Sequence, residues 1–316
     1  MHWTQQVRNA PTLAAAADAT RHGFEAAGLF FGHGTDNAWD ETLWLIAHLL
    51  GIQYEAGWQS ALQTALDAPA DDQIVKQLLT IAEARIETRK PLAYLLGEAW
   101  FAGLKFAVNE DVLVPRSPLA ELITQGFQPW VPSVDDLSML DLCTGSGCIA
   151  IATALYQPTW QVDASDVSVA ALDVAERNVA NYDLGDRVTL IEADVFNAAL
   201  FQQYHLIVSN PPYVDAAEMN ERPDEFAREP VLGLAAGDDG LDIVRAILAD
   251  AAEHLHDDGV LICEVGASDR ALQEEYSTVP FTWLEFDDGG AGVFVLTKSQ
   301  LRAHNDVLQQ KRTGTQ

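Results

Sequence analysis

The chain has 316 residues, of which 48% are hydrophobic, so it is long and apolar enough for two domains or one large one. Lys and Arg total 18 against 47 Asp and Glu, and the formal net charge of -29 argues against direct nucleic-acid binding, because basic surfaces must neutralise the phosphates. The same charge favours encounter with basic partners, although solubility or a salty cytoplasm would also account for it.

Features of export, membrane insertion and metal binding are not evident. The N-terminus lacks a basic region followed by an apolar core, and no apolar run approaches a membrane span, so we expect a cytoplasmic protein without membrane contact. The three cysteines, Cys143, Cys148 and Cys263, lack metal-ligand spacing and are expected to be reduced thiols. We therefore expect no metal site.

The first part of the chain, residues 1–95, is predicted to form a small helical domain, because its apolar residues recur at helical spacing. Residues 96–136 are predicted to form a linker. It contains a β-hairpin between Glu98 and Pro115, with a bend at Gly103, and a short helix from Leu119 to Phe127.

From residue 137 the pattern changes to alternating strands and helices, which predicts an α/β domain over 137–300. Its strands are continuous apolar runs, typical of strands that helices cover on both sheet faces. The expected strands are 139–143, 161–166, 187–194, 205–209, 259–265, 281–286 and 292–296, and the expected helices are 148–156, 169–181, 241–256 and 269–276. The turn at 287–290 predicts an antiparallel hairpin of the last two strands at the sheet edge. The polar tail, 301–316, is expected to fray.

The most informative segment is Asn210–Tyr213, which reads Asn-Pro-Pro-Tyr and directly follows the apolar run 205–209. Ligands bind at the carboxyl ends of strands in open α/β sheets, and this strand end would present a side-chain amide and free carbonyls there. Pro211 and Pro212 have no N–H and a fixed φ, so the loop is stiff and no helix consumes its carbonyls. Such a loop can accept hydrogen bonds from a planar –NH2 group. It therefore indicates an amide, an aminopurine or an aminopyrimidine as substrate, whereas a simple rigid turn would leave the strand-end position unexplained.

A loop with two glycines, Asp141–Cys148, joins the first strand of this domain to a helix. Gly145 and Gly147 let the backbone turn tightly and approach a ligand, and the start of the helix offers free N–H groups. Read as Gly-x-Gly-x-x-Ala, the loop would weakly suit a dinucleotide.

Acidic residues stand at three neighbouring strand ends and point to a different ligand. Asp141 could pair with a cationic ammonium, Asp166 with ribose hydroxyls and Asp194 with an adenine amino group. This arrangement favours S-adenosyl-L-methionine over NAD, whose pyrophosphate is negative; helix capping is the alternative for Asp166 and Asp194. The predicted cofactor-binding residues are Asp141, Cys143, Thr144, Gly145, Ser146, Gly147, Asp166, Asp194, Val195 and Asn210.

Taken together, these segments resemble a class I S-adenosylmethionine-dependent methyltransferase, and more narrowly the protein-(glutamine-N5) methyltransferases that act on release factors and on a ribosomal protein. The resemblance spans residues 97–297 and rests on four segments: Leu113–Arg116, Asp141–Gly147, Asn210–Tyr213, and Glu229–Pro230 with Gly237–Leu241. The chain is closest to the branch that modifies the third protein of the large ribosomal subunit (ribosomal protein L-three). The release-factor branch usually has Pro-acid-Thr-Glu where this chain has Ser117–Ala120. It also often has an aromatic residue at the place of Val195, while many class I enzymes have glycine at that of Cys143.

The resemblance implies a Rossmann-like seven-stranded sheet with an antiparallel last strand, a helical N-terminal domain that recognises the substrate and a linking hairpin. It implies methylation of a glutamine side-chain amide in ribosomal protein L-three, a basic partner. The implied catalytic residues are Asn210, Pro211 and Tyr213, and Asn210–Tyr213 together would bind the substrate. The Asn210 side-chain oxygen and the Pro211 carbonyl would accept the two N–H bonds of the glutamine, and Tyr213 would pack against the amide plane.

Other functions remain open at this stage. Glutamine methylation of release factors is one, and methylation of adenine amino groups in DNA or RNA is another, because those enzymes use a similar tetrapeptide. The acidity and the absence of a basic patch disfavour nucleic acid. An NAD-dependent oxidoreductase would leave Asn210–Tyr213 unexplained, and a non-catalytic ribosome-assembly factor would not need both motifs. Phe101, Phe106 and Arg116 are further candidates for cofactor contact, and Glu229 is a candidate to brace the loop after Tyr213.

Overall fold

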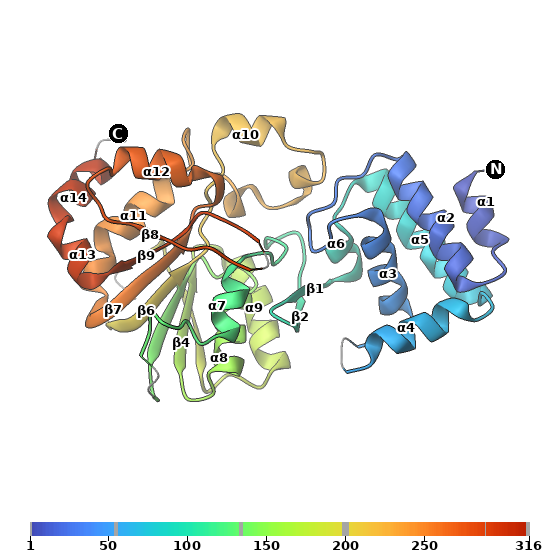
Figure 1. Ribbon diagram of the computed structural model, residues 1–316, viewed down its shortest axis with the longest axis horizontal. Coiled ribbons are helices and arrows are strands. Elements are labelled where there is room, and N and C mark those ends of the chain that lie inside the picture. Colours follow the sequence, from blue (N-terminus) through green and yellow to red (C-terminus); the bar gives the residue numbers. More distant parts are fainter. Residues whose placement is uncertain (1, 54–55, 133–134, 198–201, 288, 314–316) are drawn as a thin grey trace. The chain divides into compact units, whose positions relative to one another are not determined.

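The computed structural model describes residues 2–53, 56–132, 135–197, 202–287 and 289–313, and the chain divides into two compact units. The first unit consists of Met1–Ala99 and Pro223–Arg228, and the second of Trp100–Arg222 and Glu229–Gln316. Figure 1 shows the elements of each unit along the chain. The first unit therefore takes in a short segment that follows Asn210–Tyr213 in sequence.

Helices form the first unit, as the sequence predicts: α1 (Trp3–Arg8), α2 (Leu13–Ala26), α3 (Ala38–Leu49), α4 (Trp58–Asp67), α5 (Asp72–Thr88) and α6 (Leu92–Leu96). Side-chain caps fix the starts of α3 and α5. The side chain of Asn37 accepts from two backbone N–H groups of α3, and that of Asp71 does the same for α5.

A buried ion-pair cluster holds Glu225 within the first unit. Arg85 of α5 is fully buried and donates to Glu41 at 2.8 Å, to the Phe30 carbonyl at 2.9 Å and to Glu225 at 3.4 Å. The carboxylate of Glu225 also accepts from the Phe30 N–H at 3.1 Å. Because desolvated charges are costly unless they are paired, each member of this cluster depends on the others.

The second unit contains a sheet that has seven strands in the described part of the chain, in the order β5-β4-β3-β6-β7-β9-β8. The strands are β3 (Ser138–Leu142), β4 (Gln161–Asp166), β5 (Val188–Glu192), β6 (Tyr204–Ser209), β7 (Leu255–Glu264), β8 (Thr282–Trp283) and β9 (Val293–Thr297). β3 to β7 run parallel, and β9 runs antiparallel to both of its neighbours, β7 and β8. The predicted Rossmann-like sheet with an antiparallel last strand is confirmed. The last two strands do pair, with β8 at the edge; Asp288 in their turn lies outside the described residues.

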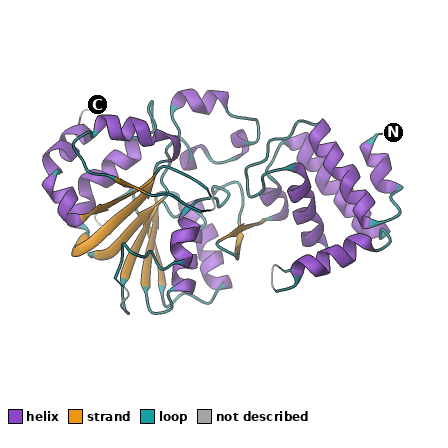
Figure 2. Cartoon of the chain, viewed as in Figure 1, coloured by secondary structure: helices purple, strands orange, loops and turns teal. Residues whose placement is uncertain are grey.

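Helices cover both faces of this sheet (Figure 2), and an apolar core lies on each face. Successive residues of a strand point to opposite faces: Leu206 and Val208 face one core, and Ile207 faces the other. The first core includes residues of α7 (Leu119–Thr124), α8 (Cys148–Tyr156) and α9 (Val169–Asn181). The second includes residues of α11 (Asp242–Asp250), α12 (Asp269–Glu275), α13 (Lys298–Ala303) and α14 (Asn305–Thr313). None of the described helices is long and apolar enough to cross a membrane.

The remaining elements are short. Strands β1 (Glu98–Phe101) and β2 (Leu104–Ala107) form the predicted hairpin, but Val112–Val114, also assigned to it, are loop residues. Between β6 and α11 lie α10 (Ala216–Glu221), η1 (Phe226–Arg228) and η2 (Val231–Gly233). The turns η3 (Ala251–Glu253) and η4 (Gly266–Ser268) flank β7.

Two sequence-based expectations for the second unit are wrong. The helix expected over 241–256 ends at Asp250, and Leu255 already pairs with Tyr204 as the first residue of β7. The tail expected to fray after residue 300 is helical to Thr313, with residues 314–316 outside the described part. Leu301 and Leu308 explain this, because both are buried in the second core.

Replacing Glu225 by Ala should lower the free energy of unfolding by about 3–5 kcal/mol, since it leaves Arg85 buried without one of its carboxylates. Urea unfolding followed by circular dichroism measures the change. Glu25→Ala, which breaks an exposed pair with Arg21, is the matched control and should leave the midpoint nearly unchanged. Equal effects of the two substitutions would contradict a special role for the buried cluster.

Candidate active site

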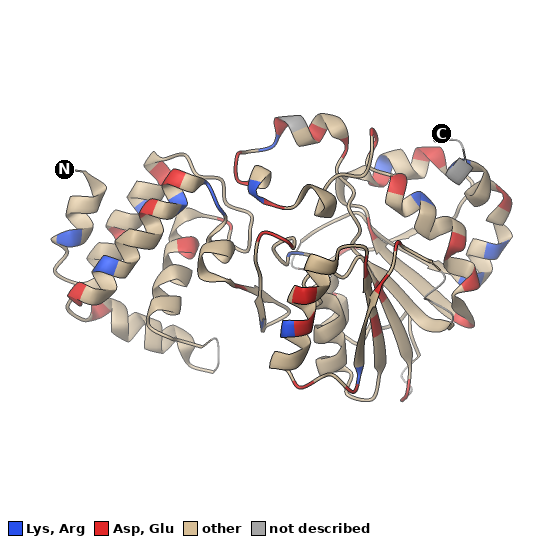
Figure 3. Ribbon diagram, turned by 180° about the vertical axis from the view of Figure 1, so that it is seen from behind, with Lys and Arg blue, Asp and Glu red and all other residues tan. Residues whose placement is uncertain are grey.

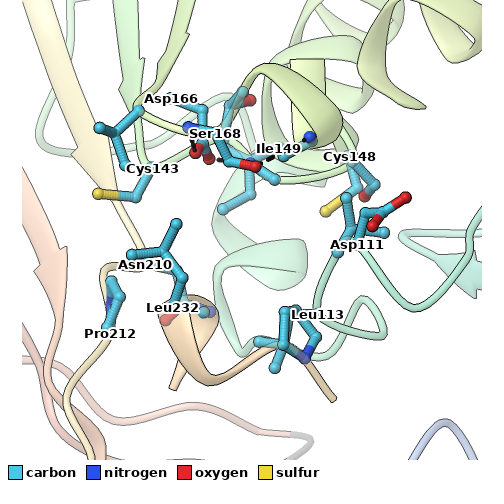
Figure 4. A pocket seen from close by; sticks show the side chains of 18 of the residues that line it. Asp111, Leu113, Cys143, Cys148, Ile149, Asp166, Ser168, Asn210, Pro212 and Leu232 are labelled. Carbon is cyan, nitrogen blue, oxygen red and sulfur yellow. Dashed lines mark hydrogen bonds between the residues drawn. The ribbon is translucent and has the colours of Figure 1, made fainter. Parts of the chain in front are cut away.

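A cavity of about 270 Å³ opens at the carboxyl ends of β3, β4, β5 and β6, wholly within the second unit. The strand-to-helix loops supply one part of its lining: Cys143–Ser146, Asp166–Ser168, Ala193–Val195, and Asn210 with Pro212. The rest comes mainly from two other segments, Glu110–Ser117 and Pro230–Ala235. Figure 4 shows side chains from all three sources around the same space. This is the crevice at which open α/β sheets bind their ligands.

The glycine loop after β3 has the conformation that its residues predict. Gly145 and Gly147 have φ values of 55° and 78°, which L side chains rarely adopt. A Cβ on Gly147 would lie 3.1 Å from Ile151 and 3.2 Å from Ala175, so this glycine lets α8 pack against α9. Gly147 does not line the cavity. Cys143 does line it, and it holds a φ of 59° where a glycine would be unstrained.

Asp166, at the end of β4, lines the cavity and braces the glycine loop. Its Oδ2 accepts from the Gly145 N–H and its Oδ1 from the Ser168 N–H, both at 2.9 Å. Burial raises the pKa of this carboxyl even though both hydrogen bonds lower it. Each oxygen can accept a further hydrogen bond, so a ligand with hydroxyl groups could share the carboxylate with the loop.

Asp141, in contrast, lies beneath the loop and does not line the cavity. Its side chain is fully buried, and its Oδ2 accepts from the Thr144 hydroxyl at 2.5 Å and from the Ala150 N–H at 3.2 Å. Its Oδ1 has no hydrogen-bond partner among the described residues. Burial raises the pKa of Asp141 to about 7. Asp141 therefore holds the glycine loop in place through hydrogen bonds from its buried side.

The cavity lining carries more negative than positive charge. The acids are Glu110, Asp111, Asp166 and Asp194, and the one basic residue in the lining is Arg116. The guanidinium of Arg116 is already paired with Glu229, at 2.6 and 2.7 Å. Such a site favours a cationic ligand and disfavours a pyrophosphate.

Three further sequence-based candidates have defined places. Glu229 is buried, and its carboxylate also accepts from the Val114 N–H at 3.2 Å, so it braces the segment from Val114 to Arg116, whereas the sequence suggested the loop after Tyr213. Phe101 and Phe106 belong to the first apolar core and do not line the cavity. Glu110 and Asp111 were missed, although two acids directly before Val112–Arg116 could have drawn attention.

The segment Asn210–Tyr213, the proposed substrate loop, follows β6 directly. Asn210 and Pro212 line the cavity, whereas Pro211 and Tyr213 do not. In the described part of the chain, the Asn210 side chain and the Pro211 carbonyl oxygen make no hydrogen bond. Two acceptors are therefore available at this strand end. The Tyr213 hydroxyl instead donates to Glu264 at 3.0 Å. No group of His, Cys, Asp and Glu side chains in the described ranges could hold a metal ion.

Comparison with known proteins agrees with this geometry. The family model of the methyltransferase small domain matches residues 124–226. The ribosomal protein uL3 glutamine methyltransferase of Xanthomonas campestris is 46% identical over 291 residues, which cover 91% of this chain and 92% of the relative. That of Xylella fastidiosa strain Temecula1 is 47% identical over 302 residues, 95% of each chain. Among solved structures, a methyltransferase from Pyrococcus furiosus is 18% identical, with a TM-score of 0.46, over 68% of this chain and 97% of that one.

The sheet topology, the cavity at its carboxyl edge, the match to the methyltransferase small domain and the two curated relatives define a class I methyltransferase. More narrowly, the chain belongs to the family of the ribosomal protein uL3 glutamine methyltransferases. The resemblance found in the sequence is thereby confirmed.

Asp141→Asn should change how stability depends on pH. A buried acid with a raised pKa keeps its proton in the folded state at pH values where the unfolded chain has lost it. The folded state therefore loses stability as pH rises from about 4 to about 7. The asparagine does not titrate. The free energy of unfolding of the variant, relative to that of the parent, should therefore rise by up to about 4 kcal/mol across this window, at about 1.4 kcal/mol per pKa unit.

Thermal unfolding of both proteins at a series of pH values measures this gain. Asp257→Asn is the control with the opposite sign, because the hydrogen bond from Lys298 lowers the pKa of Asp257. The stability of that variant, relative to that of its parent, should decrease as pH rises above the acid range. If the difference in stability between Asp141→Asn and the parent stays constant with pH, the raised pKa of the buried Asp141 carboxyl is refuted.

Proposed function

We propose that this protein transfers a methyl group to the side-chain amide nitrogen of a glutamine in ribosomal protein uL3. The names of relatives at 46% and 47% identity, matched over more than nine tenths of their length, support the substrate. One observation supports the reaction above all others: the Asn210 side chain and the Pro211 carbonyl oxygen are unused acceptors at the strand end beside the cavity. A primary amide has two N–H bonds, and it matches these two acceptors.

The cavity is the proposed site of S-adenosyl-L-methionine. Its acidic lining suits a cationic ligand, and both Asp166 oxygens retain capacity for ribose hydroxyls. Asp194 is exposed at the end of β5, where it can accept from an adenine amino group, and Val195 lines the cavity beside it. The orphaned Oδ1 of Asp141 adds a buried acceptor under the loop. When bound, the cofactor supplies an electrophilic methyl group on a sulfonium centre.

The protein's own contribution is positioning. An amide nitrogen is a weak nucleophile because its lone pair is delocalised into the carbonyl group. Acceptance of both N–H bonds by Asn210 and Pro211 fixes the nitrogen and favours a more tetrahedral geometry, which localises the lone pair. Such orientation and hydrogen bonding can supply most of the rate. The amide proton leaves after transfer, so the proposal requires no dedicated general base.

The surface charge is consistent with a basic substrate. Asp and Glu are spread over elements of both units, whereas Lys and Arg are few (Figure 3). Complementary charge raises the rate of encounter and suppresses wrong partners. We assign substrate recognition to the helical unit and the hairpin, and we place the reaction in the cytoplasm, where ribosomal proteins are made. The same acidity disfavours methylation of DNA or RNA, and Ser117–Ala120 depart from the release-factor branch.

Deletion of the gene should remove one methyl group from a glutamine of uL3, as measured by mass spectrometry of ribosomal proteins and release factors from the deletion strain and its parent. Expression of the protein in the deletion strain should restore the methyl group. Loss of a methyl group from a release factor would keep the chemistry and overturn the substrate. Unchanged protein methylation would overturn the proposed function.

Asn210→Ala should reduce turnover by about a thousandfold or more, because it removes an acceptor on which orientation of the amide depends. Cofactor affinity should stay within a few-fold of the parent. Transfer of labelled methyl groups to purified uL3 and calorimetric titration with S-adenosyl-L-methionine measure the two quantities. Asn181→Ala, at an exposed position at the end of α9, is the matched control. Turnover by Asn210→Ala close to that of Asn181→Ala would sink the assignment.

A further inference from the structure

We propose that Glu264, the last residue of β7, is a positioning residue for methyl transfer, which it serves by fixing Tyr213 and thereby the direction of the substrate loop. This inference rests on the proposed function and adds a residue to it. Glu264 neither lines the cavity nor belongs to any segment that carries the sequence resemblance.

The contacts of Glu264 connect two segments that line the cavity. Its side chain is only 4% exposed. Its Oε1 accepts from the Tyr213 hydroxyl at 3.0 Å, and its Oε2 accepts from the Ser117 hydroxyl at 2.5 Å. The Ser117 oxygen in turn accepts from the Leu119 N–H at the start of α7. One carboxylate therefore joins the substrate loop to the segment Glu110–Ser117.

The surroundings of Tyr213 leave it little other freedom. A Cβ on Gly266 would lie 2.5 Å from its ring, and a Cβ on Gly240 would lie 2.4 Å from its carbonyl oxygen, so both glycines are in close contact with it. That carbonyl accepts from the Ser268 hydroxyl at 3.0 Å. The hydrogen bond from the hydroxyl group to Glu264 adds a polar restraint at the far end of the ring. Because the two prolines before Tyr213 are stiff, we expect a shift of this residue to carry over to Asn210.

The charge of Glu264 matters for both hydrogen bonds. A carboxylate accepts from both hydroxyl groups, whereas a protonated acid must use one oxygen as a donor. Burial raises the pKa of Glu264 to about 7, although its hydrogen bonds and the Arg116 guanidinium lower it. Two cations act on this contact, Arg116 and Arg222, and both lower the pKa of the Tyr213 phenol. Arg116 is paired with Glu229, and burial raises the pKa values of the Tyr213 phenol and the adjacent Cys263 thiol.

Two predictions for the rate follow. The turnover number should rise with pH through about 7, as Glu264 ionises and the loop becomes fixed. Removal of the charge should lower turnover without a matching loss of cofactor binding, because Glu264 does not line the cavity. A misplacement of reacting groups by about 1 Å can cost about a hundredfold in rate, which sets the scale.

The test compares Glu264→Gln and Tyr213→Phe with the parent enzyme on purified uL3, with kcat and the KM of S-adenosyl-L-methionine measured from about pH 6 to about pH 8.5. Each variant should have a kcat about 10–100-fold lower at the top of this range, a KM within about threefold, and no rise through pH 7. The double variant should be no worse than Glu264→Gln alone, since that substitution already removes the contact with Tyr213.

The matched control is Tyr204→Phe. Tyr204 begins β6, at the opposite end of the strand from the substrate loop, and its hydroxyl also donates to a carboxylate, that of Asp163, at 2.7 Å. This variant should retain the kcat and the pH profile of the parent. The control therefore distinguishes a general effect of losing a tyrosine–carboxylate hydrogen bond from the specific effect of losing the bond between Tyr213 and Glu264.

Several outcomes would overturn the inference. A folded Glu264→Gln with parental kcat and pH profile would do so, and so would a lower kcat with the rise through pH 7 intact, since the titrating group would then be another, such as Asp141. If Glu264→Gln fails to fold, Tyr213→Phe decides, because it leaves the carboxylate and Ser117 in place. If the parent methylates no glutamine of uL3, it is the proposed function that fails.

Discussion

The position of β3 between β4 and β6 is the constraint on which the rest of the site depends. The chain runs outward from β3 through β4 to β5, then returns to the other side of β3 as β6. The loops after these strands therefore diverge and leave a crevice between them. The glycine loop, Asp166 and the substrate loop come together only because this crossing brings their strand ends side by side. Neither a ligand-binding loop nor an amide-binding loop alone would bring two reactants together.

The acidity of the chain has two different structural consequences. Most acids are exposed, where they give the surface its negative electrostatic field. Some are buried, and three of these hold loops beside the cavity: Asp141 lies under the glycine loop, Glu229 pairs with Arg116, and Glu264 bonds to Tyr213. Burial makes such carboxylates costly, which is why the pKa values of Asp141 and Glu264 rise, in Glu264 even beside the Arg116 guanidinium. The buried carboxylates lower the stability of the folded state, and in return they hold the loops in fixed positions around the cavity.

The sequence predicts what local signals encode. Continuous apolar runs reveal the strands, and the acids and prolines directly after them reveal which strand ends carry chemistry. What it cannot reveal is which distant segments meet. Glu225 and Arg85 lie 140 residues apart, and Glu264 and Ser117 lie 147 apart, so no periodicity links either pair. The errors near the C-terminus have a related cause: the burial of Leu308 depends on a surface that only the folded sheet and its helices create.

Stiffness and direction come from different parts of the substrate loop. Pro211 and Pro212 limit how the backbone can bend, but a stiff segment still needs an anchor to point its acceptors in a useful direction. Tyr213 is suited to that task because its ring packs against Gly266 and its hydroxyl reaches the end of β7, a strand paired on both sides. The anchor is thus a residue of the sheet itself. For an amide nitrogen, whose lone pair must be held toward an electrophile without the help of a base, such rigidity replaces what proton transfer contributes in other enzymes.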